Sequence, residues 1–159
     1  MTLISMDTST KKSGVAKYVD GKLVDYQLID YDKVKDVEER INLMGTALLL
    51  YLKKNEPDAI WIEHPQGQGS NVSMVGKLCE ILGIVRAYAL SKNCEYHELM
   101  PSVWRKYSGR PYGNKKRNEL KQISIEYVKE EIGVEVNDDV ADAIVIGHSV
   151  INFFKLLEK

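Results

Sequence analysis

Cysteine is almost absent from this sequence, which removes two classes of small protein from consideration. Cys79 and Cys94 are the two cysteines among 159 residues. Two cysteines are too few for a disulfide framework, and their spacing is not that of a paired zinc ligand set. We therefore expect both thiols to be reduced and without a chemical role.

Long apolar runs are also missing. No unbroken stretch reaches the roughly 18 apolar residues of a membrane span, and the first residues, MTLISMDTST, lack the basic start and long apolar core of a secretory signal. The sequence predicts a cytoplasmic protein with no membrane partner. Its hydrophobic content of 44% and charged content of 28% fit one globular domain over residues 1–159, without repeats or low-complexity segments.

An overall excess of one charge is lacking too, because the formal net charge is only −1. The charges are nevertheless segregated along the chain. Residues 101–121 contain seven basic side chains against Glu119 alone, whereas residues 122–142 contain seven acids against Lys129 alone. Such a basic block is either a solvated surface or a segment that binds a polyanion.

Aromatic residues within the basic block favour nucleic acid as that polyanion. Trp104, Tyr107 and Tyr112 are interleaved with the cations. Cationic side chains bind phosphates, while aromatic rings stack on exposed bases. The candidate DNA-binding residues are Arg105, Lys106, Tyr107, Arg110, Lys115, Lys116 and Arg117.

The periodicity of apolar residues predicts the element order of an α/β domain. A hairpin turn at Asp20-Gly21 joins two of the strands, and helical spacing of apolar residues marks the helices. The predicted strands are 2–7, 13–19, 22–30, 59–63 and 94–99. The predicted helices are 37–54, 73–90, 115–131 and the apolar segment that begins near residue 138, with a basic loop over 101–114.

Four acids stand at the ends of the most apolar elements. Asp7 ends the first strand and Glu63 ends the fourth, while Asp139 and Asp142 lie one turn apart at the head of the last helix, in NDDVADAIVIG. A carboxylate in such a segment is costly to bury unless it is paired or bound to a cation. If the two strands are neighbours, the acids converge, and their repulsion predicts a divalent cation with oxygen ligands, Mg²⁺ or Mn²⁺.

Two neighbouring residues have simpler interpretations. Asp138 follows Asn137 at the start of the last helix, so either side chain can be the N-cap, and Asp138 is the favoured one. His64 stands beside Glu63, where a histidine usually makes a structural hydrogen bond, and contact with substrate is the less favoured alternative.

Three motifs carry a family resemblance along nearly the whole chain. MDTSTKKSGVA, WIEHP and DDVADAIVIG resemble, in order and spacing, motifs of the RuvC family of Holliday-junction resolvases. The resemblance implies an RNase H-like fold, in which three antiparallel strands and then two parallel strands form a five-stranded mixed sheet flanked by helices. It also implies that Asp7, Glu63, Asp139 and Asp142 are catalytic acids that hold two Mg²⁺ ions, for which Mn²⁺ would substitute.

The basic segment, MPSVWRKYSGRPYGNKKRNELK, resembles the family segment whose lysines approach the scissile phosphate. The implied candidates are Lys106 and either Lys115 or Lys116, with Lys116 favoured as the catalytic one. One residue departs from the family pattern, because Gln66 stands where the family often has a phenylalanine that stacks at the junction crossover. The Lys-, Tyr- and Ile-rich composition fits a bacteriophage or a low-GC bacterial relative, and a phage-encoded protein would act in the host cytoplasm.

The predicted function is that of a Mg²⁺-dependent, structure-specific endodeoxyribonuclease that cuts four-way junctions by paired nicks, with other branched DNA as a wider set of candidate substrates. The family resemblance implies a homodimer. In helix 73–90 a row of small residues would let a second backbone approach, although packing against a helix of the same chain explains the row equally well. The row consists of Gly76, Cys79, Gly83 and Ala87, and the stripe expected to face the sheet consists of Met74, Leu78, Leu82, Val85 and Ala89.

Other functions fit parts of the sequence. An RNase H-like or YqgF-like ribonuclease would use the same acids on RNA. A sugar-kinase-like module would use MDTSTKKSG as a phosphate loop, but its usual two domains would not fit in 159 residues. A non-catalytic nucleic-acid-binding protein is disfavoured because it has no use for intact acids.

Overall fold

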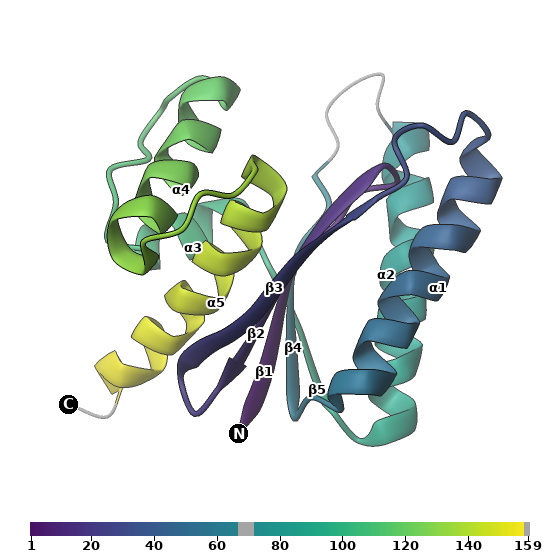
Figure 1. Cartoon of the computed structure of the whole chain (residues 1–159), viewed down its shortest axis with the longest axis horizontal. Coiled ribbons are helices and arrows are strands. Elements are labelled where there is room, and N and C mark those ends of the chain that lie inside the picture. The colour runs from purple at the N-terminus through teal and green to yellow at the C-terminus, as the bar shows by residue number, and fades with distance from the viewer. Residues whose placement is uncertain (67–71, 158–159) are drawn as a thin grey trace.

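One mixed sheet forms the centre of the protein. The computed structural model describes residues 1–66 and 72–157. The strands lie in the order β3-β2-β1-β4-β5 (Figure 1). The β2 strand is antiparallel to both of its neighbours, β1 and β3, whereas β4 is parallel to β1 and β5 is parallel to β4. The strand bounds are β1 Thr2–Asp7, β2 Lys12–Val19, β3 Lys22–Asp30, β4 Ala59–Glu63 and β5 Glu95–Leu99. The predicted α/β fold with a five-stranded mixed sheet is confirmed.

Helices cover both faces of this sheet, and each face has its own apolar core (Figure 1). On one face lie α1 (Val37–Asn55) and α2 (Val72–Lys92), and on the other lie α3 (Pro101–Tyr107), α4 (Arg117–Ile132) and α5 (Asp138–Leu157). No described helix has the length and hydropathy needed to cross a bilayer. The prediction of a loop over 101–114 is partly wrong, because Pro101 starts a short helix, a position where its missing N–H costs nothing.

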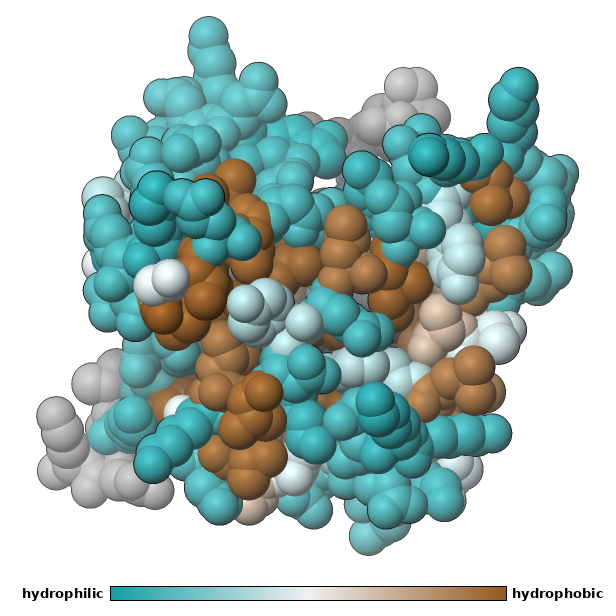
Figure 2. Space-filling view, viewed as in Figure 1, coloured by the Kyte–Doolittle hydropathy of each residue, from teal (hydrophilic) through white to brown (hydrophobic). Residues whose placement is uncertain are grey.

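The hairpin between β2 and β3 forms as its sequence predicts. Asp20 and Gly21 have φ values of 49° and 75°, so both central residues are left-handed, as a type I′ turn requires. β3 forms an edge of the sheet, and its outward side chains Val24 and Leu28 are 55% and 37% exposed. Figure 2 shows hydrophobic surface over the strands between the two helical layers, whereas hydrophilic residues cover the outer side of α4.

The α2 helix has one buried face and one open face. Leu82, Val85 and Ala89 of the predicted stripe are buried, but Met74 is 44% exposed, because the first turns of α2 extend beyond the core. All members of the small-residue row are exposed. Within the described part of the chain, no atom lies within 4 Å of a Cβ built at Gly76 or Gly83. The interpretation that this row packs against another helix of the same chain is therefore wrong.

The α5 helix lies unusually close to β1 and β2, and two glycines permit the approach. A Cβ on Gly14 would stand 1.9 Å from the Asp139 carbonyl oxygen, and one on Gly147 would stand 2.3 Å from the Tyr18 ring. Buried hydroxyls fix the helix in this place, since Ser5 donates to the Ala143 carbonyl at 2.7 Å. Tyr18 donates likewise to the Ile144 carbonyl at 2.7 Å. The first turn of α5 is thereby held over the end of β1.

Candidate active site

Two of the predicted acids stand side by side at the carboxyl ends of adjacent strands. In the parallel pair of β1 and β4, Met6 is the partner of Ile62, so Asp7 and Glu63 follow at neighbouring strand ends. Parallel neighbours necessarily present their carboxyl ends at one edge of the sheet. The expectation that these strands are neighbours is confirmed.

The other two predicted acids come from the first turns of α5, which lies beside that edge. Asp139 and Asp142 line the same cavity as Asp7 and Glu63, a hollow of about 800 Å³. The structure thus brings together four carboxylates from three elements that are far apart in the sequence. Arg105, Lys115, Arg117 and Lys121 also line the cavity.

The pKa values of the two strand-end acids, Asp7 and Glu63, are both raised. Burial raises the pKa of Asp7 well above its usual range, and the charges of Glu63, Asp142 and Asp139 raise it further. Burial also raises the pKa of Glu63, although a hydrogen bond from Trp104 and the charge of Arg105 oppose the change. The indole Nε1–H of Trp104 donates to Glu63 Oε2 at 2.8 Å.

The pKa values of the two acids of α5 are also raised. Burial, with a contribution from Glu63, raises the pKa of Asp142 to about 7, against a hydrogen bond from Ser124 that favours the charged form. Burial and the neighbouring Asp138 charge raise the pKa of Asp139. An added positive charge in the cavity would relieve all four carboxylates at once.

The donor set of this cavity fits a hard divalent cation. All four acids offer carboxylate oxygens, the ligands that Mg²⁺ and Mn²⁺ prefer. Among the His, Cys, Asp and Glu side chains of residues 1–66 and 72–157, no three form a ready-made metal site. Without a cation these like charges repel one another, and side-chain rotations are needed to bring their oxygens onto one cation.

Asp138 has a different role from its neighbours. The N-cap of α5 is Asn137, whose Oδ1 accepts from the Val140 N–H at 3.2 Å, so the preference for Asp138 as the cap is wrong. Asp138 is the first residue of α5 and forms an ion pair with Lys121. Partial burial acts to raise the pKa of Asp138, but the hydrogen bond and charge of Lys121 outweigh this effect and lower the pKa. Asp138 also lines the cavity, but its charge is already paired with that of Lys121.

The structure divides the predicted DNA-binding residues into two groups. Arg105, Lys115 and Arg117 line the carboxylate cavity. Lys106, Tyr107, Arg110 and Lys116 do not. Lys121, which the sequence did not single out as a DNA contact, also lines the cavity.

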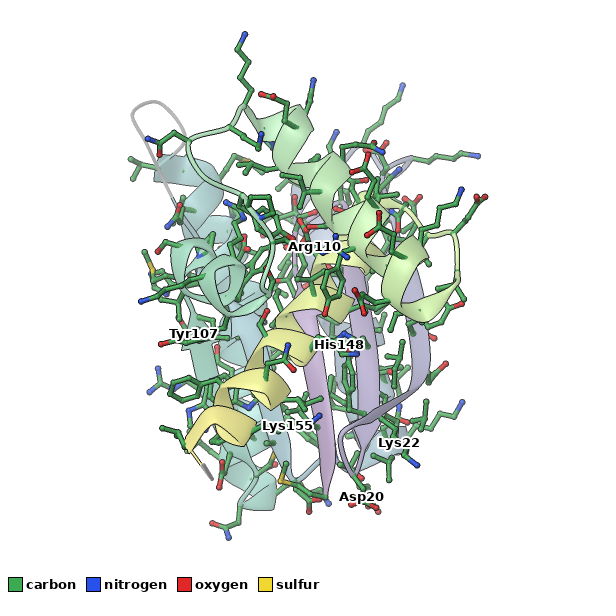
Figure 3. All side chains as sticks on the ribbon, turned by 90° about the vertical axis from the view of Figure 1, so that its left-hand side faces the viewer. Asp20, Lys22, Tyr107, Arg110, His148 and Lys155 are labelled. Carbon is green, nitrogen blue, oxygen red and sulfur yellow. The ribbon has the colours of Figure 1, made fainter. Side chains whose placement is uncertain are left out.

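Two members of the second group make side-chain contacts elsewhere, and Lys116 is exposed. Arg110 lies beside α4 and forms ion pairs with Glu130 and Glu131, at 2.7 and 3.1 Å (Figure 3). The Lys106 ammonium lies over the Tyr107 ring at 5.7 Å. Lys116 is the exposed N-cap of α4, and its backbone N–H donates to the Glu119 side chain at 2.9 Å.

Two of the three aromatics proposed as base-stacking platforms face inward. Trp104 is 0% exposed and Tyr112 is 4% exposed, so neither ring is available to a base, and that expectation is wrong. Tyr107 is half-buried and packs edge-on against Phe153 with ring centroids 4.9 Å apart. The helical turn of α3 causes this, because it directs Trp104 into the core while the adjacent Arg105 reaches the cavity.

The chain that follows Glu63 borders the cavity on one side. His64 makes the expected hydrogen bond, with its Nδ1 2.6 Å from Glu98 Oε2. Gln66, at the position of the family's stacking aromatic, is exposed and lines the cavity. The polar loop residues Gly67, Gly69, Ser70 and Asn71 lie outside the described residues.

The protein shares its fold with known proteins, but its sequence matches none of those searched. No protein-family model and no curated protein matches the sequence. The structure of RuvC from Thermus thermophilus in complex with a Holliday junction substrate superposes with a TM-score of 0.74 at 16% identity, over 98% of this chain and 96% of that one. The chain has the RuvC fold. Two other resolvases share this RuvC fold over nearly all of the present chain.

The first of these two is the Fowlpox virus resolvase, solved with Holliday junction DNA, at a TM-score of 0.59 and 16% identity over 99% and 98% of the two chains. The second is the yeast mitochondrial Holliday junction resolvase, at 0.64 and 12% over 98% and 81%. At these identities the likeness lies in backbone geometry, so the site must be argued from this chain's own side chains.

Several residues that shape the site escaped sequence analysis. Ser5, Gly14 and Tyr18 fix α5 over the sheet, and the Ser124 hydroxyl favours the charged form of Asp142. The one available signal was the set of small or polar residues inside otherwise apolar strands, where a close approach of another backbone is a standard explanation.

Proposed function

We propose that this protein is a metal-dependent, structure-specific endonuclease that cuts phosphodiester bonds in four-way DNA junctions. The observation that carries the proposal is the convergence of Asp7, Glu63, Asp139 and Asp142 in one cavity, with every pKa raised by burial or like charge. Arrangements of this kind stabilise a fold poorly and are characteristic of sites that bind a cation and perform chemistry.

The four carboxylates would hold Mg²⁺ or Mn²⁺, the cations that carboxylate oxygens suit. When bound, such cations provide an activated water and stabilise the leaving oxygen of an in-line attack on a phosphodiester. Burial of Asp7 against β1 and β2 fixes its backbone, and the Trp104 N–H holds one oxygen of Glu63. The protein therefore supplies carboxylate oxygens from fixed backbone positions around one cavity.

The cations of the cavity wall supply the complementary contact to DNA. Arg105, Lys115 and Arg117 line the cavity, and the segment 101–121 brings all of them to one side of the acids. A guanidinium or ammonium group there binds the scissile phosphate and offsets the charge that develops on it. Lys116 stays a candidate for an adjacent phosphate, because it is exposed at the start of α4.

Junction DNA is the proposed substrate because two of the structures that share the fold are complexes with a Holliday junction. The shared RuvC fold and the basic wall beside the acids support DNA rather than a small phosphate ester. Gln66 occupies the rim of the cavity, where a polar side chain would contact bases or sugars by hydrogen bonds instead of by stacking.

Paired cuts require two sites, and the open face of α2 offers a surface for a second copy of the chain. Its row of Gly76, Cys79, Gly83 and Ala87 is exposed, and small residues let two helices approach closely. A two-fold axis through this row would repeat one patch on both protomers. The homodimer is thus part of the proposed function.

The test is a cleavage assay on four substrates with Mg²⁺: a four-way junction, a linear duplex, a flap and an RNA–DNA hybrid of matched sequence. We expect cleavage of the junction by paired nicks, some cleavage of the flap, and no cleavage of any substrate in EDTA. Preferential cutting of the hybrid would instead support an RNase H-like ribonuclease. Cleavage that persists in EDTA would contradict the metal dependence.

A further inference from the structure

The short helix α3 and the chain after it place a buried aromatic pair directly behind the carboxylates. Trp104 and Tyr112 contact edge to face, with ring centroids 5.6 Å apart and planes at 82°. Both side chains are buried. A pair of aromatic rings in this position could be simple core packing, so the polar atoms of the two rings decide its role.

The polar atom of Trp104 reaches the first carboxylate. Its Nε1–H donates to Glu63 Oε2 at 2.8 Å, and an indole has no other donor and no acceptor. Because Trp104 is 0% exposed, its ring cannot swing away to release this bond. One oxygen of Glu63 is therefore fixed, and the other is left to face the cavity.

The polar atom of Tyr112 reaches a second carboxylate through one intermediate. The Tyr112 hydroxyl lies 2.9 Å from Ser124 Oγ, and the Ser124 hydroxyl favours the charged form of Asp142. When the single proton of Ser124 is directed at the carboxylate, the Tyr112 hydroxyl is the donor to Ser124. Burial raises the pKa of Tyr112 to about 12, which keeps that hydroxyl protonated and able to donate.

The same rings also hold the nearest cation. The Arg105 guanidinium lies over the Trp104 ring at 4.8 Å and over the Tyr112 ring at 5.7 Å. Its Nε is buried and has no hydrogen-bond partner within residues 1–66 and 72–157, so stacking on the rings, rather than an ion pair, sets its position. Arg105 is thereby kept available to an incoming anion.

We propose that the Trp104–Tyr112 pair positions Glu63 and Asp142 for cation binding, through the indole N–H in one case and through Ser124 in the other. This inference rests on the proposed metal-dependent nuclease function and assigns positioning residues to its site. Carboxylates on β4 and α5 are far apart in the sequence, and one buried aromatic pair that contacts Glu63 directly and Asp142 through Ser124 restricts their separation. Oriented ligands bind a cation with less loss of side-chain freedom.

The first experiment measures the Mg²⁺ concentration that gives half-maximal junction cleavage. Trp104→Phe, which keeps a ring but removes the N–H, should raise this concentration about tenfold, and Tyr112→Phe should raise it about threefold because it acts through Ser124. The double variant should show less than the product of both effects, since the two residues serve one cluster. The Michaelis constant for the junction should change less than twofold.

Matched controls separate positioning from packing. Trp61→Phe alters the other tryptophan, which stacks on His97, and Tyr127→Phe removes a hydroxyl that contacts His148. Both controls should leave the Mg²⁺ requirement unchanged, whatever they do to stability. If Tyr112→Phe and folded Trp104→Phe also leave it unchanged within about twofold, where about tenfold is typical for lost ligand support, the inference is wrong.

The second experiment needs neither DNA nor catalysis. In the Trp61→Phe background Trp104 is the single tryptophan, so its fluorescence reports the environment of the indole bonded to Glu63. Titration with Ca²⁺ or Mg²⁺ should change the emission saturably, and adding Glu63→Gln should shift the midpoint to at least about tenfold higher cation. An emission that does not respond, or a midpoint that Glu63→Gln leaves unchanged, would overturn the inference.

The two experiments fail in different ways. If the parent protein cuts no DNA substrate with any divalent cation, the proposed function fails, while the fluorescence titration still decides whether Trp104 senses a cation at Glu63. If the parent cuts the junction but the aromatic variants keep its Mg²⁺ dependence, the nuclease function stands and the positioning role is rejected.

Discussion

Asp7 is the acid whose removal separates catalysis from folding most clearly. It pairs with Gly14 at the end of β1 and is repelled by three other carboxylates. Asp7→Asn should abolish measurable junction cleavage. The free energy of unfolding at neutral pH should stay the same or rise by roughly 1 kcal/mol, because a repelling charge is lost from a buried site.

The measurement combines a nicking assay with denaturant unfolding and junction binding in EDTA. Asp20→Asn is the matched control, because Asp20 lies in the β2–β3 turn, where asparagine also tolerates a positive φ. The control should cleave normally. An Asp7→Asn protein that cleaves at the parent rate would remove Asp7 from the site.

Asp142 provides a pH prediction. Its pKa rises from 3.8 to about 7 on folding, so the folded state binds more protons than the unfolded state between these values. In EDTA the free energy of unfolding should therefore be highest near the acid end of this window and fall as the pH rises toward 7, by about 1.4 kcal/mol for each unit of pKa shift that Asp142 actually has.

Urea unfolding at a series of pH values tests this directly. Asp142→Asn should be flatter across the window, since the amide does not titrate. Mg²⁺ should restore stability most at the high-pH end, where the carboxylates are charged and repel one another. If the parent and Asp142→Asn show the same pH slope across the window in EDTA, the Asp142 pKa is not raised.

At the scale of elements, the segment from α3 to the start of α4 contains basic side chains that line the cavity and others that form ion pairs with acids of α4. Lys115 and Arg117 line the cavity, whereas Arg110 forms ion pairs with acids of α4. Replacing Lys115 or Arg117 by Ala should weaken junction binding and lower the slope of log K against log salt by about one unit for each lost phosphate contact.

Arg110→Ala is the internal comparison and should leave the salt slope unchanged. Binding measured in Ca²⁺ or EDTA over a range of salt concentrations provides the slopes without cleavage. Equal slopes in all three variants would mean that the cavity wall is a solvated surface and that DNA binds elsewhere.

The contact between α5 and β2 makes a prediction about stability. A Cβ at Gly14 would overlap the backbone of Asp139, which cannot move aside as a flexible side chain can. Gly14→Ala should lower the free energy of unfolding by about 1–3 kcal/mol, the usual range for overpacking, and should displace the first turn of α5.

Gly76→Ala in the exposed part of α2 is the control and should be neutral or stabilising by up to about 1 kcal/mol, because alanine favours a helix. Denaturant midpoints compare the two variants. A Gly14→Ala protein as stable as the parent would show that α5 does not approach β2 this closely.

At the scale of the whole molecule, assembly decides whether cuts are paired. Gly83→Leu adds a bulky side chain in the middle of the open face of α2, where the folded monomer has room for it. We expect the variant to fold normally but to sediment as a monomer, and to leave single nicks where the parent makes paired cuts.

Thr46→Leu, on the exposed side of α1, adds the same side chain away from this face and should leave assembly unchanged. Sedimentation at micromolar concentration, with and without junction DNA, measures the state directly. A parent protein that is monomeric in both conditions would rule out the proposed dimer.

The sequence alone determined the elements and the residues that end them. The Asp20-Gly21 hairpin, the strands that end in Asp7 and Glu63, and the apolar helix headed by Asp139 and Asp142 are all present as predicted. These features depend on period and on local turn chemistry, which short stretches of sequence carry. The adjacency of β1 and β4 followed once the element order was read as an RNase H-like fold.

Only the tertiary structure decided which side chains of the basic segment face the acids and which face the core. Trp104 and Arg105 are neighbours in sequence, yet one is buried behind Glu63 and the other reaches the cavity, whereas Arg110 turns toward α4. A residue's side-chain direction depends on what its element packs against, and the partners here are α5, α4 and the end of β4. The closeness of α5 to the sheet, set by Gly14 and Gly147, is likewise a property of two distant segments that no local pattern records.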